Sequence, residues 1–109
     1  MLLSYTNDKG KETSVRISPV PLAVPVTIGR DQTADIAVKD SQCSRINTSI
    51  RYWTDVFVVR DMGSANGTYL NGDKIEVAYL RPGDVIRVGN TEITAKPEDH
   101  KRPDVTERI

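Results

Sequence analysis

The chain has 109 residues, enough for one domain with a buried core but too few for two. Hydrophobic residues make up 38% and charged residues 28% of it, and no apolar run is long enough to cross a bilayer. Fifteen basic residues balance fifteen acidic ones, so no overall field attracts nucleic acid, and the one cysteine excludes an internal disulfide. The opening residues become polar too soon for a signal peptide, so we expect a cytoplasmic protein.

Short extended segments separated by turn residues are predicted in the first half of the chain. Residues 2–6 and 13–17 flank the turn cluster at 7–10, which predicts a hairpin, and residues 13–17 alternate with the period of a strand buried on one face. Prolines at 19, 21 and 25 favour a connection. Extended structure is then expected at 26–28, which leads into Gly29-Arg30, and briefly at 36–38.

The second half gives stronger signals. Ile46, Thr48, Ile50 and Tyr52 alternate with Asn47, Ser49, Arg51 and Trp53, which predicts a strand, and the apolar run 56–59 predicts a central strand. Asn71-Gly72 joins segment 68–70 to an extended piece at 74–75. Pro and Gly occupy the central positions of a type II turn at 81–84, and segments 85–88 and 91–95 flank a two-residue hairpin loop.

Strands of three to six residues with turns every eight to twelve residues, and no sustained helical period, predict an all-β antiparallel sandwich or barrel. Residues 96–109 are charged and include two prolines. We therefore expect a folded domain at 1–95 and a tail or linker at 96–109.

Catalysis finds little support in the sequence. The only histidine, His100, lies in the predicted tail, so no Ser/His or Cys/His pair is available to the folded part, and no His/Cys metal site can be assembled. No P-loop or dinucleotide fingerprint is present. We expect Cys43 to be a small, partly buried apolar residue. The sequence thus indicates a binding protein, and we expect no enzyme activity, no cofactor and no metal.

Three predicted loops carry residues suited to an anion: Gly29-Arg30, Ser44-Arg45 and the segment 63–67 with Ser64 and Asn66. Arginine presents a planar fork of donors, serine a hydroxyl, and open loops offer backbone N–H groups. Asn66-Gly67, like Asn71-Gly72, is expected to form a tight turn in which both residues have positive φ. Each signal alone also fits a solvated arginine or a plain glycine-rich loop.

Taken together and in order, these motifs resemble the forkhead-associated (FHA) domain over residues 2 to 95. The segments that carry the resemblance are Gly29-Arg30, Asp35-Ile36, Ser44-Arg45-Ile46-Asn47, the run from Asp61 to Thr68, Asn71-Gly72, the run from Leu80 to Ile86, and Gly89.

This resemblance implies a sandwich of two antiparallel sheets whose loops at one end bind phosphothreonine in a partner peptide. Arg30 and Ser44 would hold the phosphate, Arg45 would support it or meet flanking peptide residues, and Asn66 would bond to the peptide backbone. Ser64 is also assigned to the phosphopeptide-binding set, whereas Asp61, Thr68 and Asp84 would shape loops. The implied partner is a phosphothreonine protein downstream of a Ser/Thr kinase, with no nucleic acid and no membrane.

Two positions depart from the family pattern. Asn47 stands where the family usually has a histidine that braces the loops, and asparagine is expected to supply one such hydrogen bond. Ala65 stands where Ser or Thr often adds a hydroxyl, leaving its backbone N–H for the phosphate. A phosphate-independent assembly module of the same fold is therefore the alternative. Thr106, three residues before Ile109, suggests a tail that is phosphorylated and occupies such a pocket; a cut linker is the other interpretation.

Overall fold

The structure is a computed structural model that describes residues 1–7, 9–19 and 24–98. His100, Thr106 and the rest of the segment 99–109 lie outside the described residues, so the expectations placed on them stay predictions. The described part forms eleven strands: β1 (Leu2–Thr6), β2 (Glu12–Arg16), β3 (Val26–Gly29), β4 (Ile36–Ala37), β5 (Thr48–Trp53), β6 (Val56–Asp61), β7 (Thr68–Leu70), β8 (Asp73–Ile75), β9 (Val77–Leu80), β10 (Val85–Val88) and β11 (Thr91–Lys96).

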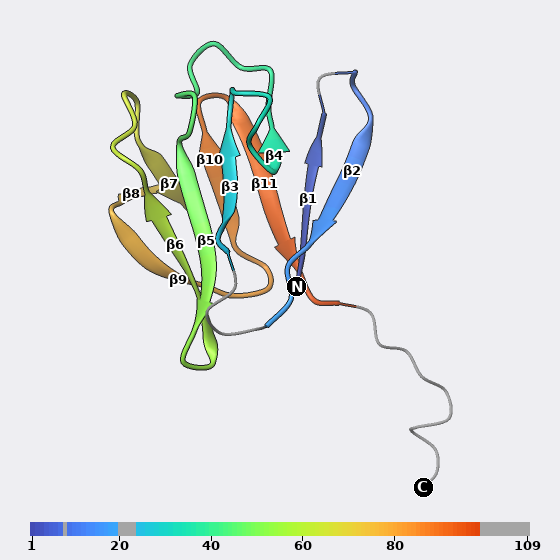
Figure 1. The fold of residues 1–109 in the computed structure, drawn as a ribbon, viewed down its shortest axis with the longest axis vertical. Coiled ribbons are helices and arrows are strands. Elements are labelled where there is room, and N and C mark those ends of the chain that lie inside the picture. Colours follow the sequence, from blue (N-terminus) through green and yellow to red (C-terminus); the bar gives the residue numbers. More distant parts are fainter. Residues whose placement is uncertain (8, 20–23, 99–109) are drawn as a thin grey trace, which may run out of the picture.

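The strands form two sheets packed face to face, which confirms the predicted sandwich (Figure 1). One sheet has six strands in the order β2-β1-β11-β10-β7-β8, and the other has five in the order β4-β3-β5-β6-β9. Every pair is antiparallel except β3 and β4, which run parallel. The expectation of purely antiparallel sheets is thus wrong at this edge, where β4 contributes two residues.

Local turn chemistry correctly predicted four connections between strands. β1 and β2 form the first hairpin, and the turn between β7 and β8 has φ of 52° at Asn71 and 92° at Gly72, as a type I′ turn requires. The β9–β10 connection is a type II turn, because Gly83 has φ of 100° and the N–H of Asp84 donates to the carbonyl of Arg81 at 3.0 Å. β10 and β11 pair around Gly89-Asn90 as expected.

In the middle of the chain, one strand begins later than predicted, one is central as predicted, and one was not predicted. β5 begins at Thr48, so Ile46 lies before the strand, and the next residue, Asn47, is fully buried instead of facing outward. The apolar run in β6 pairs on both edges, as a central strand does, but only Val59 is fully buried. β9 was not predicted, because its sequence Val77-Ala78-Tyr79-Leu80 follows β8 with no turn signal between them.

The core lies between the sheets and draws on both. Leu3, Ile86 and Ile93 come from the six-stranded sheet, whereas Ile28 and Ile50 come from the five-stranded one, and all five are fully buried. Each such side chain contributes about 1.5–3 kcal/mol of burial free energy. The sandwich therefore gives its loops a rigid base.

The two chain ends of the described part meet away from the long loops (Figure 1). The carboxylate of Glu98 forms an ion pair with the amino group of Met1 at 3.5 Å and a closer one with the guanidinium of Arg16. Lys96 still pairs with Leu2, so contacts of the sandwich continue past Ala95. The division into residues 1–95 and 96–109 stays a prediction, since residues 99–109 are not described.

Gly29, the last residue of β3, lets the following loops come together. A Cβ atom at this position would lie 2.0 Å from the carbonyl oxygen of Arg45 and 2.9 Å from the Cα of Ile46. Those atoms belong to the backbone, which cannot give way as a flexible side chain can. Only glycine allows this close approach between β3 and the segment that leads into β5.

We expect Gly29→Ala to lower the free energy of unfolding by about 3 kcal/mol, at the upper end of ordinary overpacking costs, because the backbone around Arg45 must move. The matched control is Gly10→Ala, where the added methyl meets no atom within 4 Å and only the positive φ is unfavourable. That control is expected to cost about 1–2 kcal/mol. Urea denaturation of both variants measures the difference, and equal costs would contradict the packing argument.

Candidate functional site

Three loops lie together at one end of the sandwich: residues 30–35 after β3, 38–47 after β4 and 62–67 after β6 (Figure 1). Each contains or directly follows an aspartate whose carboxylate accepts the backbone N–H two residues later. The three pairs are Asp31 with Thr33, Asp40 with Gln42, and Asp61 with Gly63. Each turn bond joins residues that are close in sequence, and it stabilises the local shape of its loop.

Arg30 connects the first loop to the second. Its Nε donates to the carbonyl of Cys43 at 3.0 Å, and its backbone N–H donates to the carbonyl of Ser44 at 3.0 Å. The side chain is otherwise exposed. Because only Nε is engaged by the described residues, the terminal nitrogens of the guanidinium remain as donors at the loop surface.

Ser44 lies between the second and third loops. Its Oγ accepts the backbone N–H of Ala65 at 2.9 Å, and its own backbone N–H donates to Oδ1 of Asn47 at 2.9 Å. A hydroxyl that accepts one hydrogen bond still has its proton to donate. The expectation that the Ala65 N–H is left for a phosphate is wrong, since this N–H is already bonded to Ser44.

Asn66 forms another link between the second and third loops. Its Nδ2 donates to the backbone carbonyl of Gln42 at 2.8 Å and lies 3.3 Å from the side-chain oxygen Oε1 of Gln42. The carboxamide is exposed, and among the described residues its Oδ1 has no recorded partner. Gln42 is a site residue that the sequence did not indicate, because it acts mainly through its backbone.

Asn47 is buried behind these side chains and braces both loops. Its Oδ1 holds the N–H of Ser44, while its Nδ2 faces the carbonyl of Gly67 at 3.2 Å and the hydroxyl of Thr68 at 3.1 Å. The backbone of Asn47 adds a bond from the N–H of Met62 at 2.9 Å. The expectation of a single bracing bond is therefore too low, since the carboxamide uses its acceptor and its donors.

Ser64 is engaged within its own loop. Its hydroxyl donates to Oδ1 of Asp61 at 2.5 Å and accepts the N–H of Gly67 at 2.9 Å. Its one proton is thus committed to a carboxylate, and its predicted contact with a ligand remains untested. Gly67 has φ of 93° but Asn66 does not have positive φ, so the expected type I′ turn at Asn66-Gly67 is not formed. The loop instead connects two different sheets.

Asp61 organises this third loop, as the sequence predicted. Burial raises the pKa of its carboxyl, but hydrogen bonds from Ser64, Thr68 and Gly63 outweigh burial and hold the pKa below its ordinary value of 3.8. The hydroxyl of Thr68 donates at 2.7 Å. The carboxylate is therefore charged at neutral pH and surrounded by donors.

Arg45 is open to solvent, with 75% of its side chain exposed. Its Nη2 lies 3.4 Å from Oδ2 of Asp31, a carboxylate whose pKa is lowered first by hydrogen bonds from Thr33 and then by Arg45. An exposed pair at this distance is weak. Arg45 thus stays near the loop end and is free to exchange Asp31 for another anion.

Cys43 and Asp40 are structural. Cys43 is fully buried, more than expected, and burial together with nearby Asp40 raises the pKa of its thiol to about 11, so it is protonated at neutral pH. Asp40 accepts the N–H of Asn90 at 2.7 Å and the hydroxyl of Thr91 at 2.8 Å. Burial raises the pKa of Asp40, but these bonds outweigh burial and lower it. Asp40 therefore ties the second loop to the β10–β11 turn.

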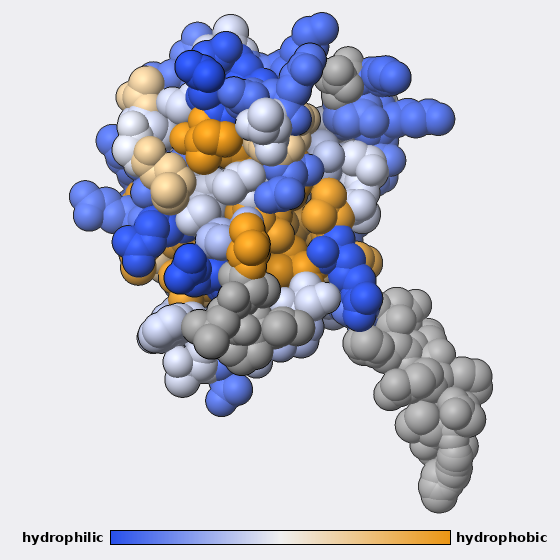
Figure 2. Space-filling model, viewed as in Figure 1, coloured by the Kyte–Doolittle hydropathy of each residue, from blue (hydrophilic) through white to orange (hydrophobic). Residues whose placement is uncertain are grey.

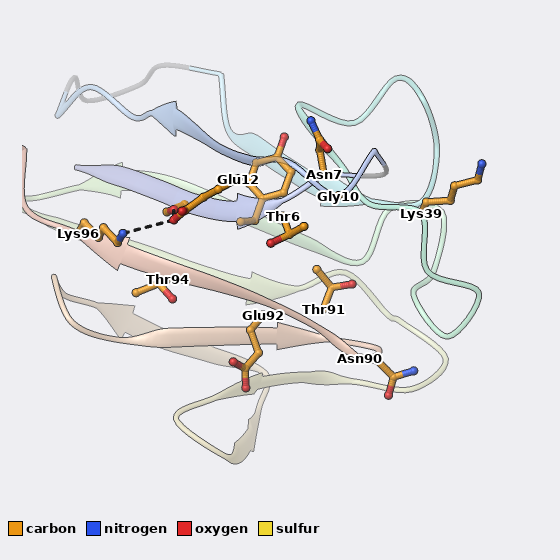
Figure 3. Close-up of a pocket in the computed structure, with 12 residues that line it drawn as sticks. Thr6, Asn7, Gly10, Glu12, Lys39, Asn90, Thr91, Glu92, Thr94 and Lys96 are labelled. Carbon is orange, nitrogen blue, oxygen red and sulfur yellow. Dashed lines mark hydrogen bonds and ion pairs between the residues drawn. The ribbon is translucent and has the colours of Figure 1, made fainter.

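A separate hollow of about 720 Å³ lies on the six-stranded sheet (Figure 3), and neither Arg30 nor Ser44 lines it. Three of its polar side chains pair with each other: Glu12 accepts the hydroxyl of Ser4 at 2.9 Å and faces Nζ of Lys96 at 3.7 Å. Within the described residues, no group of three or more His, Cys, Asp or Glu side chains can hold a metal ion. The loop end is the better candidate, because its donors face outward.

Comparison with known proteins agrees with this geometry. The family model for the FHA domain matches residues 26–89. FhaA of Mycobacterium tuberculosis is 38% identical over 69 residues, which are 63% of this chain and 13% of FhaA. GarA of the same species, a glycogen accumulation regulator, is 38% identical over 61 residues, which are 56% of this chain and 38% of GarA.

Solved structures extend the likeness to the whole sandwich. One, from work on phosphothreonine-dependent FHA domain interactions, has a TM-score of 0.70 at 29% identity and covers 91% of this chain and 99% of its own. The FhaA FHA domain, solved in complex with the intracellular domain of Rv3910, has a TM-score of 0.69 at 31% identity and covers 85% and 96%. This chain belongs to the FHA domain family. It spans less than half the length of the curated relatives named above.

Asn47→Ala is expected to lower the free energy of unfolding by about 3 kcal/mol, because the N–H of Ser44 and the hydroxyl of Thr68 lose a buried partner at about 1–3 kcal/mol per unsatisfied group. Asn90→Ala, at an exposed position, is the control and should change stability little. Urea denaturation measures both. A cost below about 1 kcal/mol for Asn47→Ala would show that solvent replaces the carboxamide.

Asp61 also predicts a pH dependence. A carboxyl whose folded pKa lies below its unfolded value stabilises the fold above the unfolded pKa of 3.8, and this stabilisation is lost as the pH falls through the lower, folded pKa. In Asp61→Asn we expect lower stability at neutral pH and a shallower loss below pH 3.8 than in the native chain. Asp73→Asn, on exposed β8, is the control. An equally steep loss of stability with falling pH in the native chain and in Asp61→Asn would contradict this role of Asp61.

Proposed function

We propose that this FHA domain binds phosphothreonine-containing segments of partner proteins through its three loops. Arg30 and Ser44 hold the phosphate, Arg45 supports it or meets flanking acidic residues, and Asn66 accepts or donates bonds along the peptide backbone. Ser64 serves the site by shaping the loop, because its proton is bonded to Asp61. The domain acts as an interaction module and not as an enzyme.

The observation that carries this proposal is the pairing of Arg30 with Ser44. Both residues are fixed by backbone contacts to each other's segment, with the N–H of Arg30 on the Ser44 carbonyl, yet each keeps donors that are not used in the fold. Donors held in place before binding need little ordering when a phosphate arrives. A phosphate dianion accepts from several such donors at once.

The expected affinity follows from these few bonds. Hydrogen bonds to charged groups contribute roughly 1.5–3 kcal/mol each, and ordering an extended peptide offsets part of that. The remaining binding free energy is about −8 kcal/mol, which corresponds to micromolar affinity. The extra methyl of phosphothreonine over phosphoserine adds only about 0.8 kcal/mol if buried, a factor of about four.

The wider setting is also a proposal. A Ser/Thr kinase would supply the phosphothreonine, and the domain, residues 1–95, would work in the cytoplasm with the tail 96–109 as a linker or as a substrate at Thr106. The described residues contain no helix that is long and apolar enough to span a membrane. The relatives support the binding class, since one solved neighbour comes from work on phosphothreonine-dependent FHA interactions.

We expect a degenerate phosphothreonine peptide library to bind the native domain with micromolar affinity. Arg30→Ala should weaken that binding about 100-fold, because two charged hydrogen bonds are lost. Ser44→Ala, which removes one donor, should weaken it about tenfold. Isothermal titration calorimetry with phosphoserine and unphosphorylated versions of an enriched peptide measures these differences.

The matched control is Arg16→Ala, an exposed arginine that pairs with Glu98 at the other end of the sandwich. It should leave affinity unchanged. Binding that ignores the phosphate or survives Arg30→Ala would reject the phosphopeptide site and favour a phosphate-independent assembly module, the function suggested by Asn47 and Ala65.

A further inference from the structure

The outer face of the five-stranded sheet is unusually apolar. Register places Arg51, Val58 and Tyr79 side by side across β5, β6 and β9, on the side opposite to the buried Ile50 and Val59. The next row on this outer face continues with Ser49, Arg60 and Val77, and Trp53 pairs with Val56 beyond. Antiparallel sandwiches normally turn polar residues to the solvent, so this face departs from the usual alternation.

The exposed fractions of its side chains show that this sheet face is apolar. The large hydrophobic side chains that are exposed in the described part of the chain all belong to this sheet or its ends. They are Val24 (88% exposed), Tyr79 (56%), Trp53 (54%), Val77 (49%) and Met62 (46%). Figure 2 shows apolar side chains at the surface around the lower end of β3, where the chain enters the sheet. The corresponding rows of the other sheet are mostly polar, as in Ser14-Ser4-Thr94 and Tyr69-Arg87-Glu92.

The face is also hollowed. A groove of about 450 Å³ passes over the small side chain of Ser49, with Val24 and Pro25 on one wall and Val58 and Met62 on the other. A second hollow of about 240 Å³ is lined by Trp53, Val58 and the same two arginines, Arg51 and Arg60. The two hollows share three lining residues and therefore lie next to each other on the sheet face; together they are called the depression.

Arg51 and Arg60 give this depression its charge. Both are exposed, and among the described residues neither takes part in an ion pair or a recorded hydrogen bond. No acidic side chain lines either hollow. A patch that combines Trp, Tyr, Met and Arg has the composition that is enriched where proteins bind other proteins.

The charge also selects among possible occupants. A second copy of this chain would place Arg51 and Arg60 against the same arginines across a two-fold axis, and such like-charge contacts are unfavourable. A nucleic acid would meet only two cations in an otherwise apolar groove. A protein segment with aliphatic side chains flanked by carboxylates satisfies both the groove and the arginines.

We propose that this sheet face, defined by Arg51, Trp53, Val58, Arg60, Met62 and Tyr79, is a second docking surface that binds an acidic amphipathic segment of a partner protein. The aliphatic side chains of the segment fill the groove over Ser49, and its carboxylates pair with Arg51 and Arg60. This binding needs neither phosphate nor Arg30. It therefore stands or falls separately from the phosphopeptide site.

The test uses defined helical peptides and NMR spectra of the ¹⁵N-labelled domain. The first probe has leucines at every third or fourth position flanked by glutamates; a second replaces the glutamates with lysines, and a third replaces the leucines with serines. We expect the first probe to shift the amides of β5, β6 and β9 and to bind about tenfold more tightly than either of the others, because the lysine probe loses the ion pairs with Arg51 and Arg60 and the serine probe loses the apolar contacts in the groove. Arg30→Ala should bind it unchanged.

Charge exchange provides the matched control. The double variant Arg51→Glu/Arg60→Glu should lose about tenfold in affinity for the glutamate peptide and gain affinity for the lysine peptide, which an unfolded variant does not do. Lys9→Glu/Lys11→Glu, with the same change in net charge at the β1–β2 turn, should behave like the native chain. Equal binding of all three peptides, or no shifts in β5, β6 and β9, would overturn the proposal. So would a concentration-dependent dimer, seen by sedimentation, that Arg51→Glu/Arg60→Glu alters.

Discussion

The buried carboxamide of Asn47 is the contact on which the loop end of this sandwich depends. One side chain holds the N–H of Ser44 in the second loop and the Gly67 carbonyl and Thr68 hydroxyl of the third, at distances between 2.9 and 3.2 Å. A buried carboxamide has both donors and an acceptor, so it can bond to two loops at once. If either loop moves away, a buried polar atom loses its hydrogen bond and no water replaces it, which is unfavourable. The family's usual histidine is thus replaced by a residue that still fixes both loops.

Acidic and basic side chains have different roles at the loop end of the molecule. Asp31, Asp40 and Asp61 are turned toward backbone N–H groups and hydroxyls, so their negative charge is used in shaping the loops. Arg30 and Arg45 are turned outward, and their remaining donors face solvent. A site that attracts an anion needs this separation, because carboxylates facing the same opening would repel a phosphate.

β6 joins the two surfaces described above. Its inward residue Val59 lies in the core, its last residue Asp61 organises the third loop, and its outward residues Val58 and Arg60 line the groove on the sheet face. Met62, directly after the strand, lines the same groove while its N–H bonds to the carbonyl of Asn47. The loops proposed to bind phosphopeptide and the apolar face are therefore neighbours on one rigid element.

The sequence determined what depends on near neighbours: the type I′ turn at Asn71-Gly72, the type II turn at Pro82-Gly83, the alternating strands, and the ordered motifs that identify the family. These features follow from local backbone preferences and spacing. Tertiary structure alone decided which groups become buried or engaged. Asn47 is buried and the Ala65 N–H is bonded to the Ser44 hydroxyl because segments distant in sequence meet there, whereas the apolar run of β6 stays half uncovered because, among the described residues, no third layer packs on its sheet.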